Sequence, residues 1–179
     1  MKRRSFVSSL MAGGLLLMVP AGVVSARDIK YFHDFSVPGD RLKRLDRDAA
    51  WWRKRLDDDA WRILFREETE RAFTSPLDKQ YSNGSYICAA CHLPLFSSDT
   101  KYDSGTGWPS FWAAYDAHMG TKTDYKAFWP RTEYHCIRCG GHQGHVFDDG
   151  PDPTGKRWCN NGLALKFVPE GEALPGLRG

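Results

Sequence analysis

The chain has 179 residues, enough for one domain and too few for several independent cores. It carries 25 Lys and Arg residues against 22 Asp and Glu residues, a net charge of +3. No segment shows the clustered basic side chains that line a nucleic-acid-binding face, so we expect no binding to a phosphate backbone. A single domain with nearly balanced charge is expected to be a monomer.

Residues 1–26 have the three-part pattern of an export signal. Three basic residues precede an apolar stretch, and the small residues Ser25 and Ala26 close it. The adjacent pair Arg3 and Arg4 resembles a twin-arginine signal, which directs export of folded cargo. We expect cleavage after Ala26 and a periplasmic location. A retained membrane anchor is the alternative, but the apolar stretch is short and its flanks do not suit a spanning helix.

Residues 27–50 are polar and are expected to form an N-terminal arm. The run from 46 to 71 is compatible with a helix, because apolar residues such as Trp52 and Trp61 recur at steps of three to five. The acidic triplet that begins at Asp57 can also cap a second helix. The pattern therefore predicts a short helical lead of either one or two helices.

The character of the chain changes after residue 75. Short stretches rich in aromatic and β-branched residues, such as SYICAA and TEYHCIR, alternate with turns rich in Gly, Pro, Asn and Asp. This pattern predicts a mostly β fold of antiparallel sheets. We place the domain at residues 51–170. The Gly- and Pro-containing tail at 171–179 is expected to be flexible.

Four of the five cysteines form two Cys-x-x-Cys pairs, Cys88 with Cys91 and Cys136 with Cys139. Two residues between ligands let one tight turn present both sulfurs to a single ion, and four thiolates complete a tetrahedral zinc shell. Such a closed shell predicts one structural Zn²⁺. The alternatives are disulfides or a thioredoxin-like redox couple, which is normally found in a β-α-β setting that this chain lacks.

Cys159 stands alone, in the segment RWCNN. The neighbouring Arg157 and a histidine from the upstream GHQGHVF segment can favour the thiolate, so this cysteine is a candidate nucleophile. An imidazolium near neutral pH can also donate a proton to an oxygen that gains negative charge. A small buried cysteine of the last strands is the structural alternative.

The chain from about Trp52 to Pro169 resembles the type B methionine-R-sulfoxide reductases. The resemblance rests on the blocks LFSSDTKYDSGTGWPSF, CIRCGGHQGHVFDDGPDPTGKRWCNN and LKFVP. It implies two antiparallel β-sheets, a four-cysteine zinc site away from the active site, and reduction of the R epimer of methionine sulfoxide in oxidised proteins.

The resemblance also implies a set of catalytic residues. Cys159 matches the family's nucleophile, His142 and His145 match its two pocket histidines, and Asn161 matches the asparagine two residues after the nucleophile. Cys159 would attack the sulfoxide sulfur while His145, or a water that it holds, protonates the oxygen. Methionine would leave, and the cysteine would become a sulfenic acid.

Four further positions match the family's substrate pocket. Trp108 and Phe147 match the aromatic walls that receive the substrate methyl group, and Arg157 and Asp149 match polar groups near the nucleophile. Thr106 stands where many members of the family have a resolving cysteine. With four cysteines on zinc, an external thiol reductant, thioredoxin-like or small, is expected to reduce the sulfenic acid.

Two rival functions remain open on the sequence alone. The first is a zinc-stabilised β binding module that presents Trp108, Trp112, Trp129 and Trp158 to a partner, with Cys159 incidental. The second is another thiol enzyme on a similar zinc-β scaffold, acting on aldehydes or thioesters. Fold alone does not separate them, since one scaffold hosts many activities.

Overall fold

The computed structural model describes residues 42–126 and 129–179, which all belong to the unit Tyr31–Gly179. The expected export signal and most of the expected N-terminal arm lie outside the described residues. Among the described residues, no helix has both the length and the hydropathy needed to span a bilayer.

The helical lead consists of two helices, α1 (Ala49–Arg53) and α2 (Asp58–Arg66). The N-cap Asp48 starts α1, because its carboxylate accepts from Trp51 N at 2.8 Å. The acidic triplet does separate the helices, with Asp57 as the N-cap of α2. Glu67 ends α2 in the left-handed conformation, with a φ of 55°. Trp52 is fully buried, as expected of a core residue.

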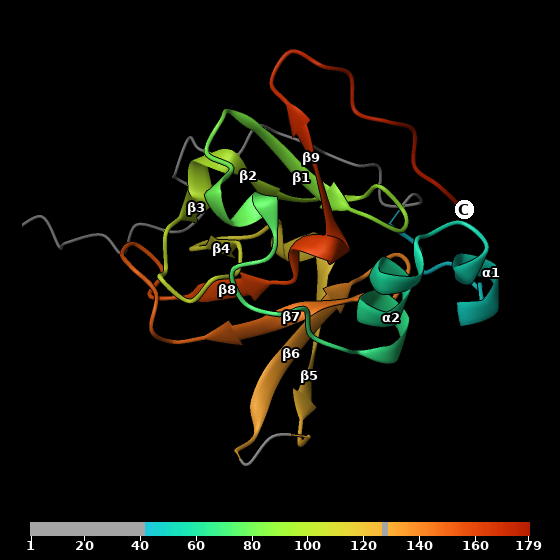
Figure 1. Cartoon of the computed structure of the whole chain (residues 1–179), viewed down its shortest axis with the longest axis horizontal. Coiled ribbons are helices and arrows are strands. Elements are labelled where there is room, and N and C mark those ends of the chain that lie inside the picture. The colour runs from blue at the N-terminus through green and yellow to red at the C-terminus, as the bar shows by residue number, and fades with distance from the viewer. Residues whose placement is uncertain (1–41, 127–128) are drawn as a thin grey trace, which may run out of the picture. The chain divides into compact units, whose positions relative to one another are not determined.

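The rest of the described chain is mostly β, as predicted, and forms two antiparallel sheets (Figure 1). The first has three strands in the order β2-β1-β9, and the second has six in the order β3-β4-β8-β7-β6-β5. The strands are β1 (Gly84–Cys88), β2 (Pro94–Ser97), β3 (Lys101–Tyr102), β4 (Ser110–Phe111), β5 (Met119–Asp124), β6 (Arg131–Cys136), β7 (His142–Phe147), β8 (Arg157–Asn160) and β9 (Leu165–Pro169). Short 3₁₀ turns lie between them: η2 (Pro76–Lys79), η3 (Ser98–Thr100), η4 (Asp116–His118) and η5 (Gly162–Ala164).

Aromatic side chains fill the core between the two sheets. Phe96 of β2 stacks on Phe111 of β4 with ring centroids 4.1 Å apart, and Tyr86 of β1 meets the same Phe111 edge-on at 4.9 Å. Tyr134 of β6 and Trp158 of β8 close this cluster, with centroids 4.9 Å apart. Because side chains alternate along a strand, the neighbours of these residues point to the other face of the six-stranded sheet.

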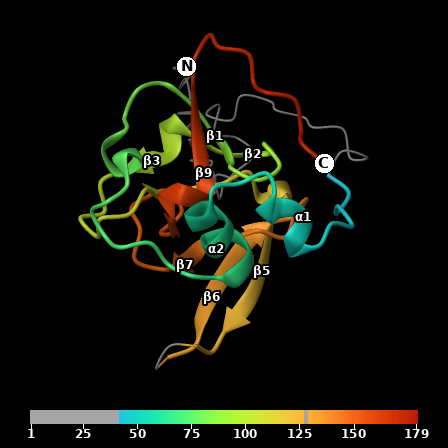
Figure 2. The same ribbon diagram turned by 45° about the vertical axis from the view of Figure 1, so that its right-hand side comes forward.

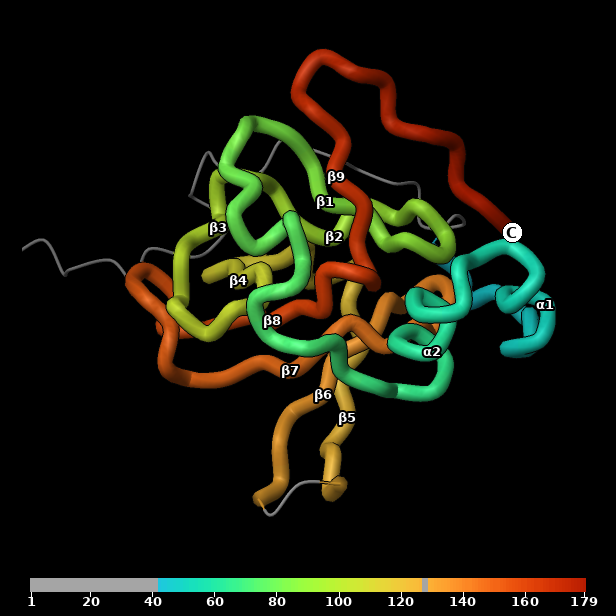
Figure 3. The backbone as a smooth tube through the Cα atoms, viewed as in Figure 1, coloured from blue at the N-terminus to red at the C-terminus, as the bar shows by residue number. Residues whose placement is uncertain are grey.

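The β5–β6 hairpin extends away from the other strands in both ribbon views (Figure 1, Figure 2). The tail after β9 runs back toward α1, as the tube shows (Figure 3). Its end is held at the cysteine pairs, because Arg178 N donates to Cys91 O at 3.0 Å and Arg138 Nη1 donates to Arg178 O at 2.5 Å. The expected flexibility of residues 171–179 in solution stays a prediction, now for a tail with these contacts.

Candidate active site and metal centre

Two turns of the same design bring the paired cysteines together. Cys88 ends β1 and Cys136 ends β6, and in each turn the residue four positions later donates its N–H back to that cysteine's carbonyl. These residues are His92, with a φ of 64°, and Gly140, with a φ of 73°. Glycine adopts this conformation without strain, which explains its place in the second turn.

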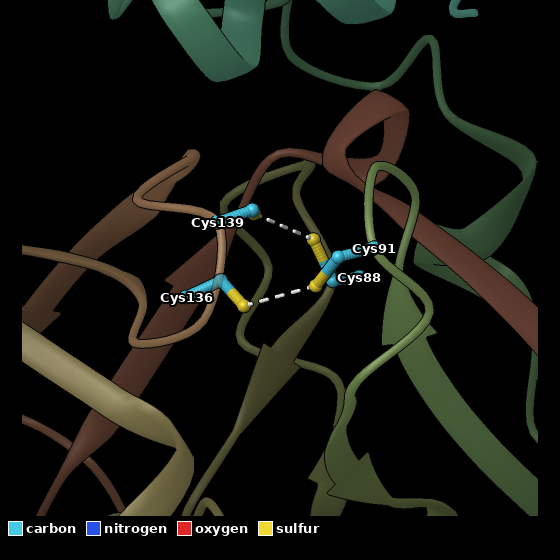
Figure 4. A group of neighbouring side chains, drawn as sticks. All are labelled: Cys88, Cys91, Cys136 and Cys139. Atoms are coloured by element: carbon cyan, nitrogen blue, oxygen red, sulfur yellow. Dashed lines mark hydrogen bonds between the residues drawn. The ribbon is translucent and has the colours of Figure 1, made fainter. Parts of the chain in front are cut away.

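The four sulfurs form one buried cluster (Figure 4). All lie within 4.8 Å of one another, with Cys88 Sγ 3.6 Å from Cys139 Sγ and Cys91 Sγ 3.5 Å from Cys136 Sγ. A disulfide would need about 2.05 Å. The edge of a tetrahedron with metal–sulfur bonds of about 2.3 Å is about 3.8 Å. The spacing therefore fits four thiolates around one ion and does not fit two disulfides.

Two N–H groups donate to these sulfurs. Gly141 N lies 3.4 Å from Cys139 Sγ, and the buried Gln143 Nε2 lies 3.5 Å from Cys88 Sγ. Such donors favour thiolates over thiols, which suits metal ligands. His92 and His135, which stand beside two of the cysteines in the sequence, are not members of the cluster.

Cys159 lies on the other face of the six-stranded sheet from the aromatic core. It pairs directly with His145 of β7 and with Ser110 of β4, so these three side chains share a face. Its neighbour Asn160 points the opposite way and is fully buried, where its Oδ1 accepts from Tyr134 Oη at 2.7 Å. The alternation of β8 thus directs the lone sulfur away from the core.

A pocket of about 270 Å³ opens at Cys159. Five of the predicted site residues line it together: Trp108, Phe147, Arg157, Cys159 and Asn161. The remaining lining residues are Thr69, Thr106, Arg131 and Asn160. The lone cysteine is therefore part of a pocket with aromatic and polar walls, and it is not a member of the hydrophobic core cluster.

The charge environment of Cys159 contains opposing contributions. Burial raises the pKa of the thiol above its ordinary value, whereas the Arg157 charge and hydrogen bonds from Thr106 and Arg157 oppose that rise. Arg157 is held in place by a two-pronged ion pair with Asp149, both contacts 2.8 Å, and lies 4.2 Å from the Phe147 ring centre. Asp149 does not line the pocket, and its contact with the site runs through Arg157.

Replacing Arg157 by Met is expected to make Cys159 less reactive at a given pH. Loss of the cation removes a contribution that favours the thiolate, so the pKa rises further and alkylation by iodoacetamide slows by about three- to tenfold near pH 8. Alkylation of the Cys159 peptide followed by mass spectrometry against pH reports the pKa. Lys156→Met, which removes an exposed ion pair with Asp148, is the matched control. An unchanged midpoint for Arg157→Met would contradict the assigned role.

The two histidines lie next to the pocket, each held by a carboxylate. His145 Nε2 lies 2.7 Å from Asp124 Oδ2, and that same oxygen accepts from Arg131 at 2.7 Å. Burial lowers the pKa of His145, although the Asp124 hydrogen bond works in the other direction. His142 Nδ1 lies 2.7 Å from Glu133 Oε1, and the two imidazole centroids are 5.5 Å apart.

Neither histidine is among the residues that line the pocket, although His145 is the direct cross-strand neighbour of Cys159. Within the described part of the chain, His142 Nε2 is buried without a hydrogen-bond partner. Asp124 and Glu133 were missed by sequence reasoning. They lie on β5 and β6, and only the strand register places Glu133 directly opposite His145. The alternation in TEYHCIR indicated that Glu133 lies on a strand, but the pairing register of that strand with its neighbour cannot be deduced from the alternation.

Asn161 is held at both ends of its side-chain amide. Its Oδ1 accepts from Glu70 N at 3.0 Å, and its Nδ2 donates to Gln143 O at 2.9 Å. The amide nitrogen carries two hydrogens, of which this bond uses one. Asn161 thus has a fixed orientation and retains a donor at the edge of the pocket.

Comparison with known proteins decides the family. The family model described as the SelR domain matches residues 56–169. The chain belongs to this family. A peptide methionine sulfoxide reductase MsrB of Leptospira interrogans is 51% identical over 120 residues, covering 66% of this chain and 92% of that protein. The MsrB protein of Methanosarcina barkeri is 44% identical over 135 residues, covering 75% of this chain and 95% of that protein.

The match places this chain among the type B methionine sulfoxide reductases, as its sequence blocks indicated. The matched range includes all four clustered cysteines and every residue predicted for the pocket. It begins just before α2, so α1 and the tail lie outside it. The catalytic and substrate-binding roles of the individual residues stay predictions.

Proposed function

We propose that this chain reduces methionine-R-sulfoxide in oxidised proteins to methionine, with Cys159 as the nucleophile. The observation that carries the proposal is the pocket in which one cysteine, outside the four-cysteine cluster, lies with an indole, a phenyl ring, a guanidinium and an oriented amide. A sulfoxide side chain presents a methyl group, an electrophilic sulfur and a polar oxygen, and the pocket has a counterpart for each.

In the proposed mechanism, the Cys159 thiolate attacks the sulfoxide sulfur. The oxygen is a poor leaving group until it is protonated, so His145, or a water that it holds, supplies the proton. Asp124 orients His145, since it fixes the ring through Nε2. His142, with its Nε2 unpartnered among the described residues, is proposed to help hold the oxygen or that water. The protonated oxygen departs as water when the bond between the two sulfurs forms. A water molecule then attacks the Cys159 sulfur and breaks that bond, so methionine leaves and Cys159 becomes a sulfenic acid.

The remaining pocket residues are proposed to fix which epimer fits. Trp108 and Phe147 receive the methyl group through apolar contact. Asn161 and Arg157 hold the polar side of the substrate through hydrogen bonds. When the methyl group and the oxygen are both fixed, only one of the two sulfoxide epimers places its sulfur where the Cys159 thiolate can attack it.

An external thiol is proposed to regenerate the enzyme. Thr106, at the position of a resolving cysteine in many relatives, contacts Cys159 through a side-chain hydrogen bond. The other four cysteines are buried in the metal cluster. A dithiol donor, thioredoxin-like or small, would therefore attack the sulfenic sulfur directly, releasing water and ending as its own disulfide.

Zinc is the ion we propose for the four-cysteine cluster. Four thiolates in a closed shell favour Zn²⁺ and leave no position for a substrate, so the ion would have a structural role. It would cross-link the end of β1 to the end of β6 and thereby join the two sheets. Export by a twin-arginine-like signal at residues 1–26, and with it a periplasmic location, is proposed on the sequence pattern alone.

The proposed function is tested with dabsylated methionine-R- and S-sulfoxide. With dithiothreitol we expect many turnovers of the R epimer and none of the S epimer. Without a thiol, turnover should stop at one per enzyme, and intact mass should show one added oxygen on Cys159 and no internal disulfide. Turnover of neither epimer would refute the proposal and favour the binding module. A disulfide to Cys159 would refute the direct role of the external thiol.

The structure gives the binding module little support. Of the four tryptophans expected on its surface, Trp158 packs in the core cluster and Trp108 lines the pocket, while Trp129 is 73% exposed between β5 and β6. These side chains therefore do not form one shared face.

A further inference from the structure

The segment between α2 and η2 contains a buried carboxylate that is no part of the chemistry outlined above. Glu70 is 7% exposed. Its Oε1 accepts from Gly162 N at 2.5 Å and its Oε2 accepts from Leu163 N at 2.9 Å. These two amides belong to η5 and directly follow Asn161 in the chain. The Glu70 carboxylate therefore binds the turn next to the pocket asparagine.

The backbone of the same residue holds two walls of the pocket. Glu70 N donates to Asn161 Oδ1 at 3.0 Å, and Glu70 O accepts from Trp108 Nε1 at 3.2 Å. The two peptide units that flank the Glu70 Cα therefore orient the Asn161 amide and the Trp108 indole. A shift of Glu70 would move both walls together.

The surrounding segment is built for close approach to the turn. A Cβ on Gly162 would lie 1.8 Å from Ser75 Oγ, so the missing side chain at this position allows the segment to pack against η5. Farther along, Phe73 N donates to Gly107 O at 2.7 Å, next to Trp108. Thr69, which directly precedes Glu70 in the chain, lines the pocket itself.

We propose that Glu70 is a positioning residue for the reductase reaction, acting through Asn161 and Trp108. Its carboxylate anchors the segment to the two amides, and its backbone then sets the separation and orientation of the groups that receive the oxygen and the methyl group. The inference rests on the proposed function. It adds a residue that touches neither the substrate nor Cys159.

Glu70→Gln is the most informative change. The carboxamide has nearly the same shape, but its NH₂ must face one of the two backbone N–H groups, so only one of the two hydrogen bonds survives. We expect kcat for the R epimer to fall by about 10- to 100-fold, because small misplacements of aligned groups slow chemistry, while KM changes by less than about threefold. Zinc content and Tm are measured on the same samples.

A double-mutant cycle with Asn161→Ala separates positioning from general destabilisation. Because Glu70 acts through both Asn161 and Trp108, the Glu70→Gln change should cost clearly less activity in the Asn161→Ala background than in the wild type, and the loss that remains reports the contact with Trp108. Asp78→Asn is the matched control, because Asp78 is also a buried carboxylate, 6% exposed, outside the pocket. Glu70→Asp, which keeps the charge on a shorter side chain, provides a second variant if Glu70→Gln does not fold.

The result expected is a folded, metal-loaded Glu70→Gln enzyme with reduced kcat, a smaller loss for the same change in the Asn161→Ala background, and a normal Asp78→Asn enzyme. If the wild type is active and the Glu70→Gln variant is equally active, the role of Glu70 is refuted, but the proposed function is not. That role would also be overturned if the full loss persisted in the Asn161→Ala background, or if Asp78→Asn lost as much activity. A wild type that reduces neither epimer would refute the proposed function and this inference with it.

Discussion

Cys159→Ser is expected to abolish reduction of methionine-R-sulfoxide, with a loss on the order of 10³-fold or more. Serine keeps the size of the side chain, but its hydroxyl ionises far above the pH of the assay. The hydroxyl also does not form the sulfur–oxygen intermediate on which the proposed reaction depends. Turnover of the R epimer with dithiothreitol measures the loss.

The same variant should keep its fold. Cys159 faces the pocket and takes no part in the metal cluster, so Tm should shift by no more than about 3 °C, a change of about 1 kcal/mol or less. Metal content should equal that of the wild type. Near-normal turnover by Cys159→Ser would refute the mechanism, and a loss of metal in this variant would place the lone cysteine at the ion after all.

Removal of the metal is expected to have the second large effect, on stability and activity together. The purified protein should contain one zinc per chain. Chelation at high temperature, or Cys139→Ser, should lower Tm by more than about 10 °C, since a structural zinc site contributes several kcal/mol to folding. Calorimetry with parallel metal analysis measures both quantities.

Activity should fall with the metal even where part of the fold survives. Gln143 links the two sites, because its side chain donates to Cys88 Sγ and its carbonyl accepts from Asn161 Nδ2. The tail is also tied to the cluster through Cys91 O. Cys159→Ser with its metal intact is the matched control for stability. A chelated protein with unchanged Tm and full turnover would contradict a structural role for the cluster.

Local patterns in the sequence were sufficient for the mostly β character of the chain and for the cysteine pairs. Alternation and turn residues predicted antiparallel sheets, and the acidic triplet at Asp57 marked the start of α2. The Cys-x-x-Cys spacing predicted two turns that point their sulfurs together, because ligand spacing within a turn is a local property. The pattern did not distinguish one helix from two, since propensity alone does not decide where a short helix ends.

The composition of the site depended on long-range pairing. Asp124 and Glu133 hold the two histidines from strands β5 and β6, and no spacing rule connects them to His142 and His145. Glu70 lies 91 residues before Asn161, and its contacts exist only because the segment after α2 crosses to η5. The resemblance pointed to five residues that line the pocket together, yet it did not indicate what orients them.

The sequence by itself determined the lone cysteine, the two Cys-x-x-Cys pairs and the β character of the chain, because each depends on residue type and short spacing. Only the tertiary structure decided which face Cys159 occupies, which carboxylates hold the histidines, and that Glu70 spans Asn161 and Trp108. Those relations follow from strand register and from the packing of distant segments, and a shift of one residue in register would turn each side chain to the opposite face.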